Sequence, residues 1–337
     1  MTPREIVFGT IEFRQPERIA LSLPEPYPND IAWARIAPDP DWKPSRTFSP
    51  EKGRMWEDEW GNVWAATTDF YQGEVVQGAI GDWSELDRYR MPSFDHPARY
   101  QRAAASFAER PDHFRLGGLP GFPFAIMRYL RRMDIFLADL LLQPDEVRRL
   151  GERVTALLCR CLDNWASAGA DGVFFCEDWG TQDRLLVSPT MWREIFRPYF
   201  DTLCGHARAR GLTVWMHSCG YIYDIIEDLI DCGIAVLQLD QPGLFGIDRL
   251  AAEFGGRVTF WCPVDIQRVL PTGDVPRIEA FAHDLIEKLG ARGGGFIAGH
   301  YGSMDGIGVE PEWQEAASRA FVKHARLHSP SALSAGL

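Results

Sequence analysis

The chain has 337 residues, of which 46% are hydrophobic and 24% charged, so it can bury one large core or two modest ones. Its formal net charge of −12 argues against binding to nucleic acid or to an anionic membrane surface. We expect no signal peptide and no membrane span, which needs ~18 consecutive apolar residues. The seven cysteines, an odd number, are typical of reduced thiols in a cytoplasmic protein.

The first 110 residues predict an irregular extension with a few short regular elements. Thr2 and Pro3 predict the N-cap and the first turn of a helix. Residues 58–64 predict a β-hairpin, in which Gly-Asn is a two-residue turn between aromatic-rich arms. Because this extension is apolar and rich in proline, we expect it to pack on the following domain. It could also cover a neighbouring subunit in a homodimer.

Residues 111–328 predict a regular alternation of strands and helices. The strand-like stretches are 172–176, 212–216, 235–239, 258–261 and 295–298, and the helix-like stretches after them are 189–210, 221–231, 247–254, 275–289 and 312–328. Continuously apolar strands of this kind indicate a parallel sheet covered by helices. A further unit at 114–142 favours a single α/β domain, a (β/α)8 TIM barrel, over an open sheet, which would need a glycine-rich phosphate turn. Residues 329–337 predict a frayed tail.

In a barrel of this kind, the residues that follow the strands form the active site. These residues are Glu177, Asp178, Gln182, His217, Cys219, Asp240, Gln241, Cys262, Asp265, Gln267, His300 and Tyr301. His217 and Cys219 are two residues apart at a strand end, where both can reach one metal ion. An imidazole and a thiolate suit zinc. His300 stands between glycines that leave its ring exposed.

Each of these residues also has an ordinary structural interpretation. A His-x-Cys pair is common by chance. Glu177 and Asp178 could cap their loop or pair with Arg184, while Asp240 could be a turn residue and Cys262 a buried filler. Carboxylates outnumber bases in the predicted mouth of the barrel, which favours a cation or a hydroxyl-bearing substrate over a polyanion.

Several short motifs occur in order between residues 171 and 316. They are Asp171-Gly-Val with Glu177-Asp-Trp-Gly-Thr-Gln, Ser188-Pro, Met216-His-Ser-Cys-Gly, Pro263-Val-Asp-Ile-Gln-Arg-Val-Leu-Pro-Thr-Gly, and Gly293-Gly-Gly-Phe-Ile-Ala-Gly-His-Tyr-Gly followed by Glu310-Pro-Glu. This set resembles the uroporphyrinogen decarboxylase superfamily, and within it the zinc-dependent corrinoid and thiol methyltransferases. The resemblance implies a (β/α)8 barrel with an N-terminal extension.

Two departures from the family pattern refine this resemblance. The decarboxylases carry an Arg-Gln-Ala-Gly-Arg motif that binds the carboxylates of the substrate, and Phe13-Arg-Gln-Pro does not replace it. Decarboxylation of a tetrapyrrole is therefore not expected. The thiol methyltransferases use a second cysteine in the closing loop as a zinc ligand, where this chain has His300. The resemblance thus implies zinc on His217, Cys219 and His300, with Cys262 or Glu177 as a fourth or alternative ligand.

We therefore expect a zinc-dependent methyltransferase that moves a methyl group between a small molecule and a corrinoid. The chain has no Asp-x-His-x-x-Gly corrinoid signature, so a separate protein would carry the corrinoid. The expected catalytic residues are Glu177, Asp178 and Asp240, and the expected substrate-binding residues are Gln182, Gln241 and Tyr301. Two alternatives remain: a metal-independent decarboxylase or lyase for a small carboxylic acid, and a non-catalytic subunit that binds a corrinoid protein.

Overall fold

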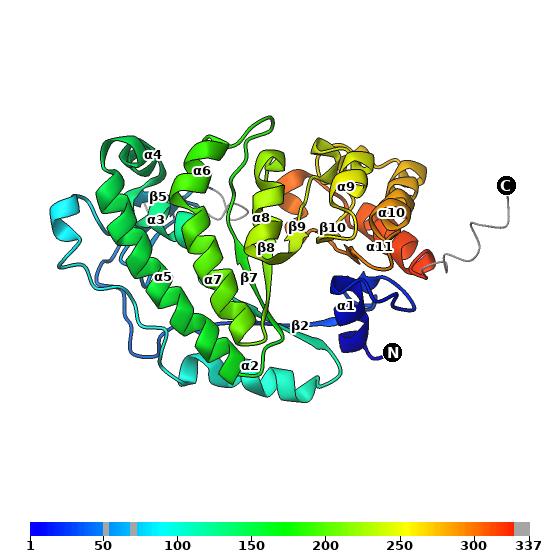
Figure 1. The fold of residues 1–337 in the computed structure, drawn as a ribbon, viewed down its shortest axis with the longest axis horizontal. Coiled ribbons are helices and arrows are strands. Elements are labelled where there is room, and N and C mark those ends of the chain that lie inside the picture. Colours follow the sequence, from blue (N-terminus) through cyan, green and yellow to red (C-terminus); the bar gives the residue numbers. More distant parts are fainter. Residues whose placement is uncertain (50–53, 68–72, 327–337) are drawn as a thin grey trace.

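The computed structural model describes residues 1–49, 54–67 and 73–326, and its centre is a parallel sheet of eight strands (Figure 1). The strands are β1 (Ala20–Leu21), β2 (Ile31–Arg35), β6 (Phe114–Gly118), β7 (Gly172–Cys176), β8 (Thr213–His217), β9 (Ile234–Gln238), β10 (Thr259–Cys262) and β11 (Phe296–Ala298). Their order in the sheet is β1-β11-β10-β9-β8-β7-β6-β2. The tail predicted at 329–337 lies outside the described residues.

Asp30 closes the barrel between the two strands at the ends of this order. Its amide donates to the Leu21 carbonyl at 2.7 Å, and its carboxylate accepts from the Leu21 amide at 2.8 Å. These bonds connect β1 to the residue that precedes β2. The sheet is therefore a nearly closed (β/α)8 barrel, which confirms the predicted fold class.

Helices surround the barrel, and α5 and α7 pack side by side on its outer surface (Figure 1). The helices are α1 (Pro3–Ile11), α2 (Ala98–Glu109), α3 (Pro123–Arg131), α4 (Met133–Leu142), α5 (Pro144–Ser167), α6 (Pro189–Ile195), α7 (Arg197–Ala209), α8 (Ile226–Cys232), α9 (Ile247–Phe254), α10 (Val275–Leu289) and α11 (Pro311–Lys323). The helix predicted at 189–210 is two helices, because Pro198 lacks the amide that would continue α6 through this point. Within the described parts of the chain, no helix has the length and apolar character to cross a membrane.

The N-terminal extension contributes to the barrel as well as packing on it. Strands β1 and β2 both lie within residues 1–110, and β1 escaped sequence detection because it is only two residues long. Helix α1 begins as expected, with Thr2 as its N-cap and Pro3 in its first turn. It packs against β1, β2, β6 and β11 and so covers the end of the barrel at which the strands begin (Figure 1).

A separate antiparallel sheet carries the predicted hairpin. Its strands are β3 (Arg54–Glu57), β4 (Val63–Ala66) and β5 (Glu74–Gln77). The connection between β3 and β4 spans residues 58–62, instead of the two-residue Gly-Asn turn. The Asp58 carboxylate organises this longer loop, since it accepts from the Asn62 amide at 2.8 Å and from Trp64 Nε1 at 2.7 Å.

Side chains inside the barrel form a plug that ends in aromatic rings. Trp215 and Val236 are fully buried in the plug, and Phe174 packs edge-on against Trp33 and Trp261 above it, at centroid distances of 5.0 and 5.6 Å. Side chains alternate along a strand, so the residue two positions after each plug residue also points into the barrel. Cys176, His217 and Gln238 are those residues, and they stand above the plug at the carboxyl ends of β7, β8 and β9.

Candidate metal centre

Three candidate ligands converge at the carboxyl ends of β7 and β8. His217 Nε2 lies 3.3 Å from Cys219 Sγ and 3.5 Å from Asp178 Oδ1. The ligand atoms of the three residues all lie within 4.8 Å of one another. Across residues 1–49, 54–67 and 73–326, no other group of three or more His, Cys, Asp or Glu side chains meets this criterion. We call these residues the Asp178–His217–Cys219 group.

Two glycines allow the loops after β7 and β8 to touch. A Cβ atom on Gly220 would collide with the Gly180 carbonyl, and Gly220 has a positive φ of 77° that other residues rarely adopt. The close approach lets the Cys219 amide donate to Asp178 Oδ1 at 2.9 Å. The backbone of one loop therefore fixes the carboxylate of the other beside the thiol.

A buried amide orients the imidazole. Gln238 Oε1 accepts a hydrogen bond from His217 Nδ1, and Gln238 Nε2 donates to Asp240 Oδ1 at 2.7 Å. Because the amide oxygen is an acceptor, Nδ1 carries a proton, and Nε2 faces Cys219 and Asp178. Metal-binding histidines are commonly oriented by such a partner on their second nitrogen.

The electrostatics of the group couple the imidazole to the carboxylate. Burial opposes a charge on His217, but its hydrogen bonds with Asp178 and Cys219 prevail and raise the pKa of His217 well above its ordinary value. Burial also disfavours a charge on Asp178, yet the contacts with His217 and the Cys219 amide lower the pKa of Asp178 to about 2. A metal ion that binds here would displace the proton from His217 Nε2.

Comparison with known proteins assigns the chain to a family. The sequence profile described as Uroporphyrinogen decarboxylase (URO-D) matches residues 68–328. The chain belongs to the uroporphyrinogen decarboxylase family. A search of curated protein sequences finds no significant match.

Solved structures resemble this URO-D family member to different degrees. The fold is similar to that of a methyltransferase from Methanosarcina mazei, with a TM-score of 0.63 and 18% sequence identity over 79% of this chain and 76% of that one. A D-psicose 3-epimerase from Clostridium cellulolyticum H10 is more distant, with a TM-score of 0.43 and 12% identity over 72% of this chain and 86% of that one. At 18% identity the likeness to the methyltransferase concerns the fold alone.

The structure of this URO-D family member does not bring His300 into the group. His300 Nδ1 lies 3.0 Å from the carbonyl oxygen of Ser22, next to β1. In the barrel order, β11 is separated from β8 by β9 and β10, whereas β7 is the direct neighbour of β8. Asp178 therefore occupies the place beside His217 and Cys219 that the sequence analysis gave to His300.

The two alternative ligands predicted for zinc are also directed elsewhere. Glu177 is fully buried, and its carboxylate accepts from the Ala125 amide and from Trp179 Nε1, both at 3.0 Å. Burial raises the pKa of Glu177 to about 8, despite these two bonds. Cys262 is fully buried, and burial raises the pKa of its thiol. Glu177 thus connects its loop to the start of α3, and Cys262 packs in the core.

The remaining predicted residues differ in how they relate to the Asp178–His217–Cys219 group. Asp240 is buried and acts on His217 through Gln238. Gln241 is buried, and within the described ranges its Oε1 has no hydrogen-bond partner. Gln182 is exposed on the loop after β7. Burial raises the pKa of the Tyr301 phenol, and the charges of Asp240 and Cys219 add to this effect.

Other predicted and unpredicted residues complete the mouth. The carboxylate of Asp265 accepts from the amides of Gly243, Gln267 and Arg268, so it holds its own loop together. Sequence reasoning missed Gln238 and Cys176, although counting two residues on from Val236 and Phe174 would have found both. Cys176 is an exposed free thiol, and its Cα is the register partner of that of His217.

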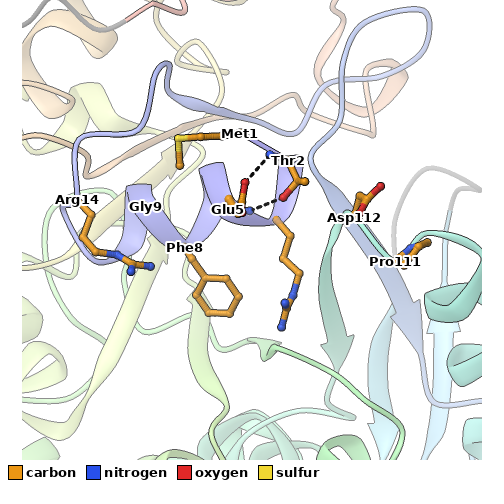
Figure 2. A pocket seen from close by; sticks show the side chains of 9 residues that line it. Met1, Thr2, Glu5, Phe8, Gly9, Arg14, Pro111 and Asp112 are labelled. Carbon is orange, nitrogen blue, oxygen red and sulfur yellow. Dashed lines mark hydrogen bonds between the residues drawn. The ribbon is translucent and has the colours of Figure 1, made fainter.

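Two cavities of similar size lie at opposite ends of the barrel. The cavity at the mouth has a volume of about 650 Å³, and its walls include Asp178, Cys176, Trp33 and Tyr129. The other, of about 670 Å³, lies beside α1 at the amino ends of the strands. Figure 2 shows its side chains, among them Thr2 and Glu5, which are hydrogen-bonded to each other in the first turn of α1. The mouth cavity alone adjoins the Asp178–His217–Cys219 group.

Proposed function

We propose that this URO-D family member is a zinc-dependent methyltransferase, which moves a methyl group between a small molecule and a corrinoid held by a separate protein. The convergence of Asp178, His217 and Cys219 beside an open cavity is the observation that carries this proposal. A fold similar to that of a methyltransferase supports it. When bound, zinc supplies Lewis acidity toward an oxygen or sulfur atom of the substrate.

The donor set fits zinc. One nitrogen, one sulfur and one oxygen are ligands that zinc accepts, and three protein ligands leave the fourth position to the substrate, as in catalytic zinc sites. The thiolate and the carboxylate together balance the two positive charges of the ion. Asp178 belongs to the group and also lines the mouth cavity, so a substrate in this cavity would lie next to a residue that would hold the ion.

The other residues of the mouth position groups and hold protons. Gln238 keeps His217 Nε2 directed at Cys219 and Asp178, where an ion would be held, and Asp240 fixes the orientation of Gln238. The raised pKa of Tyr301 keeps its phenol protonated, so it can donate a hydrogen bond to the heteroatom from which the methyl group departs. That heteroatom keeps the electron pair of the broken bond to carbon.

The proposal includes a partner and a compartment. The chain lacks an Asp-x-His-x-x-Gly motif, so the corrinoid would arrive on another protein. All seven cysteines are free, which fits a reducing compartment such as the cytoplasm.

Metal analysis combined with a methyl-transfer assay tests the proposal. The purified protein is expected to contain one zinc per chain and to methylate free cob(I)alamin from a methylated small molecule, which is followed by absorbance. His217→Ala should lose both the zinc and the transfer. His206→Ala, a matched change on the outer helix α7, should keep both. A wild-type protein that contains no zinc and takes none up would end this proposal.

A metal-independent lyase or decarboxylase is the second candidate. Asp178 Oδ1 and His217 Nε2 are 3.5 Å apart, close enough to share a proton during catalysis. This enzyme would release carbon dioxide from a small carboxylic acid after complete removal of metal by a chelator. Loss of all turnover on chelation, restored by zinc, would exclude it.

A further inference from the structure

The mouth cavity contains two arginines that form no ion pair within the described residues. Arg35 stands at the carboxyl end of β2 and is exposed, and Arg128 lies on α3 and is half-buried. Neither forms an ion pair with an acid in the described parts of the chain, and among the described residues that line the cavity Asp178 is the one acid. By contrast, Arg18 next to β1 forms an ion pair with Asp30 at 2.7 Å.

Aromatic rings hold Arg128 in a fixed position, and its charge helps to lower the pKa of Asp178. Its guanidinium lies over the rings of Phe124 and Tyr129, at 5.4 and 5.0 Å from their centroids, and donates to the Tyr129 hydroxyl at 3.2 Å. Its Nε atom is buried and has no hydrogen-bond partner in the described structure. A buried donor without a partner is costly, and an anionic ligand in this cavity would supply the missing acceptor.

The wall near the arginines is aromatic. Trp33 is 37% exposed although it is a large apolar side chain, and it packs edge-on against Phe174 at 5.0 Å. Both rings line the cavity, together with Tyr129. Flat apolar surfaces of this kind bind a planar ring, and guanidinium groups bind a carboxylate with two parallel hydrogen bonds.

We propose that the mouth cavity binds a small aromatic carboxylate. Its carboxylate would contact Arg35 and Arg128, its ring would lie against Trp33 and Phe174, and its far end would reach the Asp178–His217–Cys219 group. As a statement about the substrate of methyl transfer, this inference rests on the proposed function, but the binding itself does not. From the sequence we expected the mouth to bind a cation or a hydroxyl-bearing substrate. The two arginines add a place for one carboxylate.

Calorimetric titration with 4-methoxybenzoate tests the proposal. Wild-type protein is expected to bind it, while 4-methoxybenzyl alcohol, which lacks the charge, and acetate, which lacks the ring, should each bind at least about tenfold more weakly. Arg35→Gln and Arg128→Gln should each weaken the binding of 4-methoxybenzoate by about tenfold or more. Arg102→Gln, an exposed change on α2, is the matched control and should leave it unchanged.

The outcomes separate this inference from the proposed function. The titrations are repeated on chelated protein and on His217→Ala, where binding should persist. If the protein binds 4-methoxybenzoate but holds no zinc and transfers no methyl group, the result would support the inferred carboxylate site and contradict the proposed function. Equal binding of 4-methoxybenzoate to wild type and to both arginine variants, at unchanged melting temperature, would overturn the inference even in an active zinc enzyme. Failure of wild-type protein to bind 4-methoxybenzoate would overturn it too.

Discussion

The two ends of the barrel use the same strand in opposite ways. Asp171 immediately precedes β7 and Asp178 follows it, so one strand has a buried carboxylate at its amino end and a partly exposed one at its carboxyl end. Asp171 is fully paired, whereas Asp178 faces a cavity and two potential metal ligands. The amino end is thus arranged for stability and the carboxyl end for binding, the usual division in barrels of this type.

The amino end is closed by charge pairing. Asp171 Oδ1 accepts from Arg4 Nη2 at 2.8 Å and from Arg115 Nη2 at 2.7 Å. Burial disfavours a charge on Asp171, but the hydrogen bonds with both arginines hold its pKa below the ordinary value. Arg4 comes from α1 and Arg115 from β6, so this network joins the N-terminal helix to the barrel. The mouth, in contrast, leaves Arg128 Nε and Gln241 Oε1 buried and unbonded within the described ranges.

The largest expected effect is the loss of metal on removal of the thiol. Cys219→Ala should lower zinc affinity by roughly 10³-fold, because one of the protein ligands disappears. Methyl transfer should fall in parallel, and the melting temperature of the chelated protein should change little, since Cys219 is only half-buried. Competition with a chelator measures the affinity, and Cys159→Ala on α5 is the matched control. Unchanged affinity in Cys219→Ala would remove the thiol from the site.

A smaller effect is expected at the opposite end, on stability. Asp171→Asn should lower the free energy of unfolding at pH 7 by about 2–3 kcal/mol, less than for a fully buried pair because the Arg4 side chain is 40% exposed. Denaturant titration measures this change. Zinc content and turnover per folded molecule should remain at wild-type values; a variant that lost zinc would contradict the division between the two ends.

The same residue gives a pH dependence of defined sign. The pKa of Asp171 is lower in the folded than in the unfolded chain, so its contribution is complete above the unfolded value of about 3.9. It is lost as the pH falls through the folded pKa. Wild type should therefore lose stability more steeply than Asp171→Asn in acid, and the two free energies should converge. Parallel acid unfolding curves would contradict this prediction.

The orienting amide should matter less than a ligand. Gln238→Ala should weaken zinc binding by about 10- to 100-fold, the usual effect of removing a partner of a metal-binding histidine. Gln238→Met keeps the bulk of the side chain but offers His217 Nδ1 no strong acceptor, so it should lose as much affinity as Gln238→Ala. The exposed Gln101→Ala on α2 serves as a control. Wild-type affinity in Gln238→Met would indicate a packing role instead.

The smallest effect is expected at the N-cap of α1. Thr2 and Glu5 form a capping box, in which each side chain accepts from the backbone amide of the other. Thr2→Ala should cost about 1 kcal/mol of stability and leave zinc affinity unchanged. Thermal unfolding and chelator competition on the same sample measure both quantities. Thr2→Ser, which keeps the hydroxyl, should behave like wild type.

Much of the fold was accessible from sequence because buried parallel strands are continuously apolar. The strand predicted at 172–176 coincides with β7, and that predicted at 212–216 is one residue from β8. Strand β1 could not be predicted, because two residues give no pattern. The helix at 189–210 was drawn as one because its apolar spacing continues across the break before Pro198.

The site was only partly accessible for a different reason. His217 and Cys219 were predicted because they follow a strand in a short motif. The third member of the group, Asp178, depends on which loops touch, and this is decided by the close approach of Gly180 and Gly220, which no spacing in the sequence reveals. Arg35 and Arg128 were missed because they come from β2 and α3, outside the motifs.

X-ray absorption at the zinc edge of the metal-loaded protein tests the central claim most directly. Binding to Asp178, His217 and Cys219 predicts one sulfur at about 2.3 Å and the remaining ligands as nitrogen or oxygen at about 2.0–2.1 Å, with the sulfur absent in Cys219→Ala. Two sulfur ligands in the wild type, or an unchanged spectrum in Cys219→Ala, would contradict it.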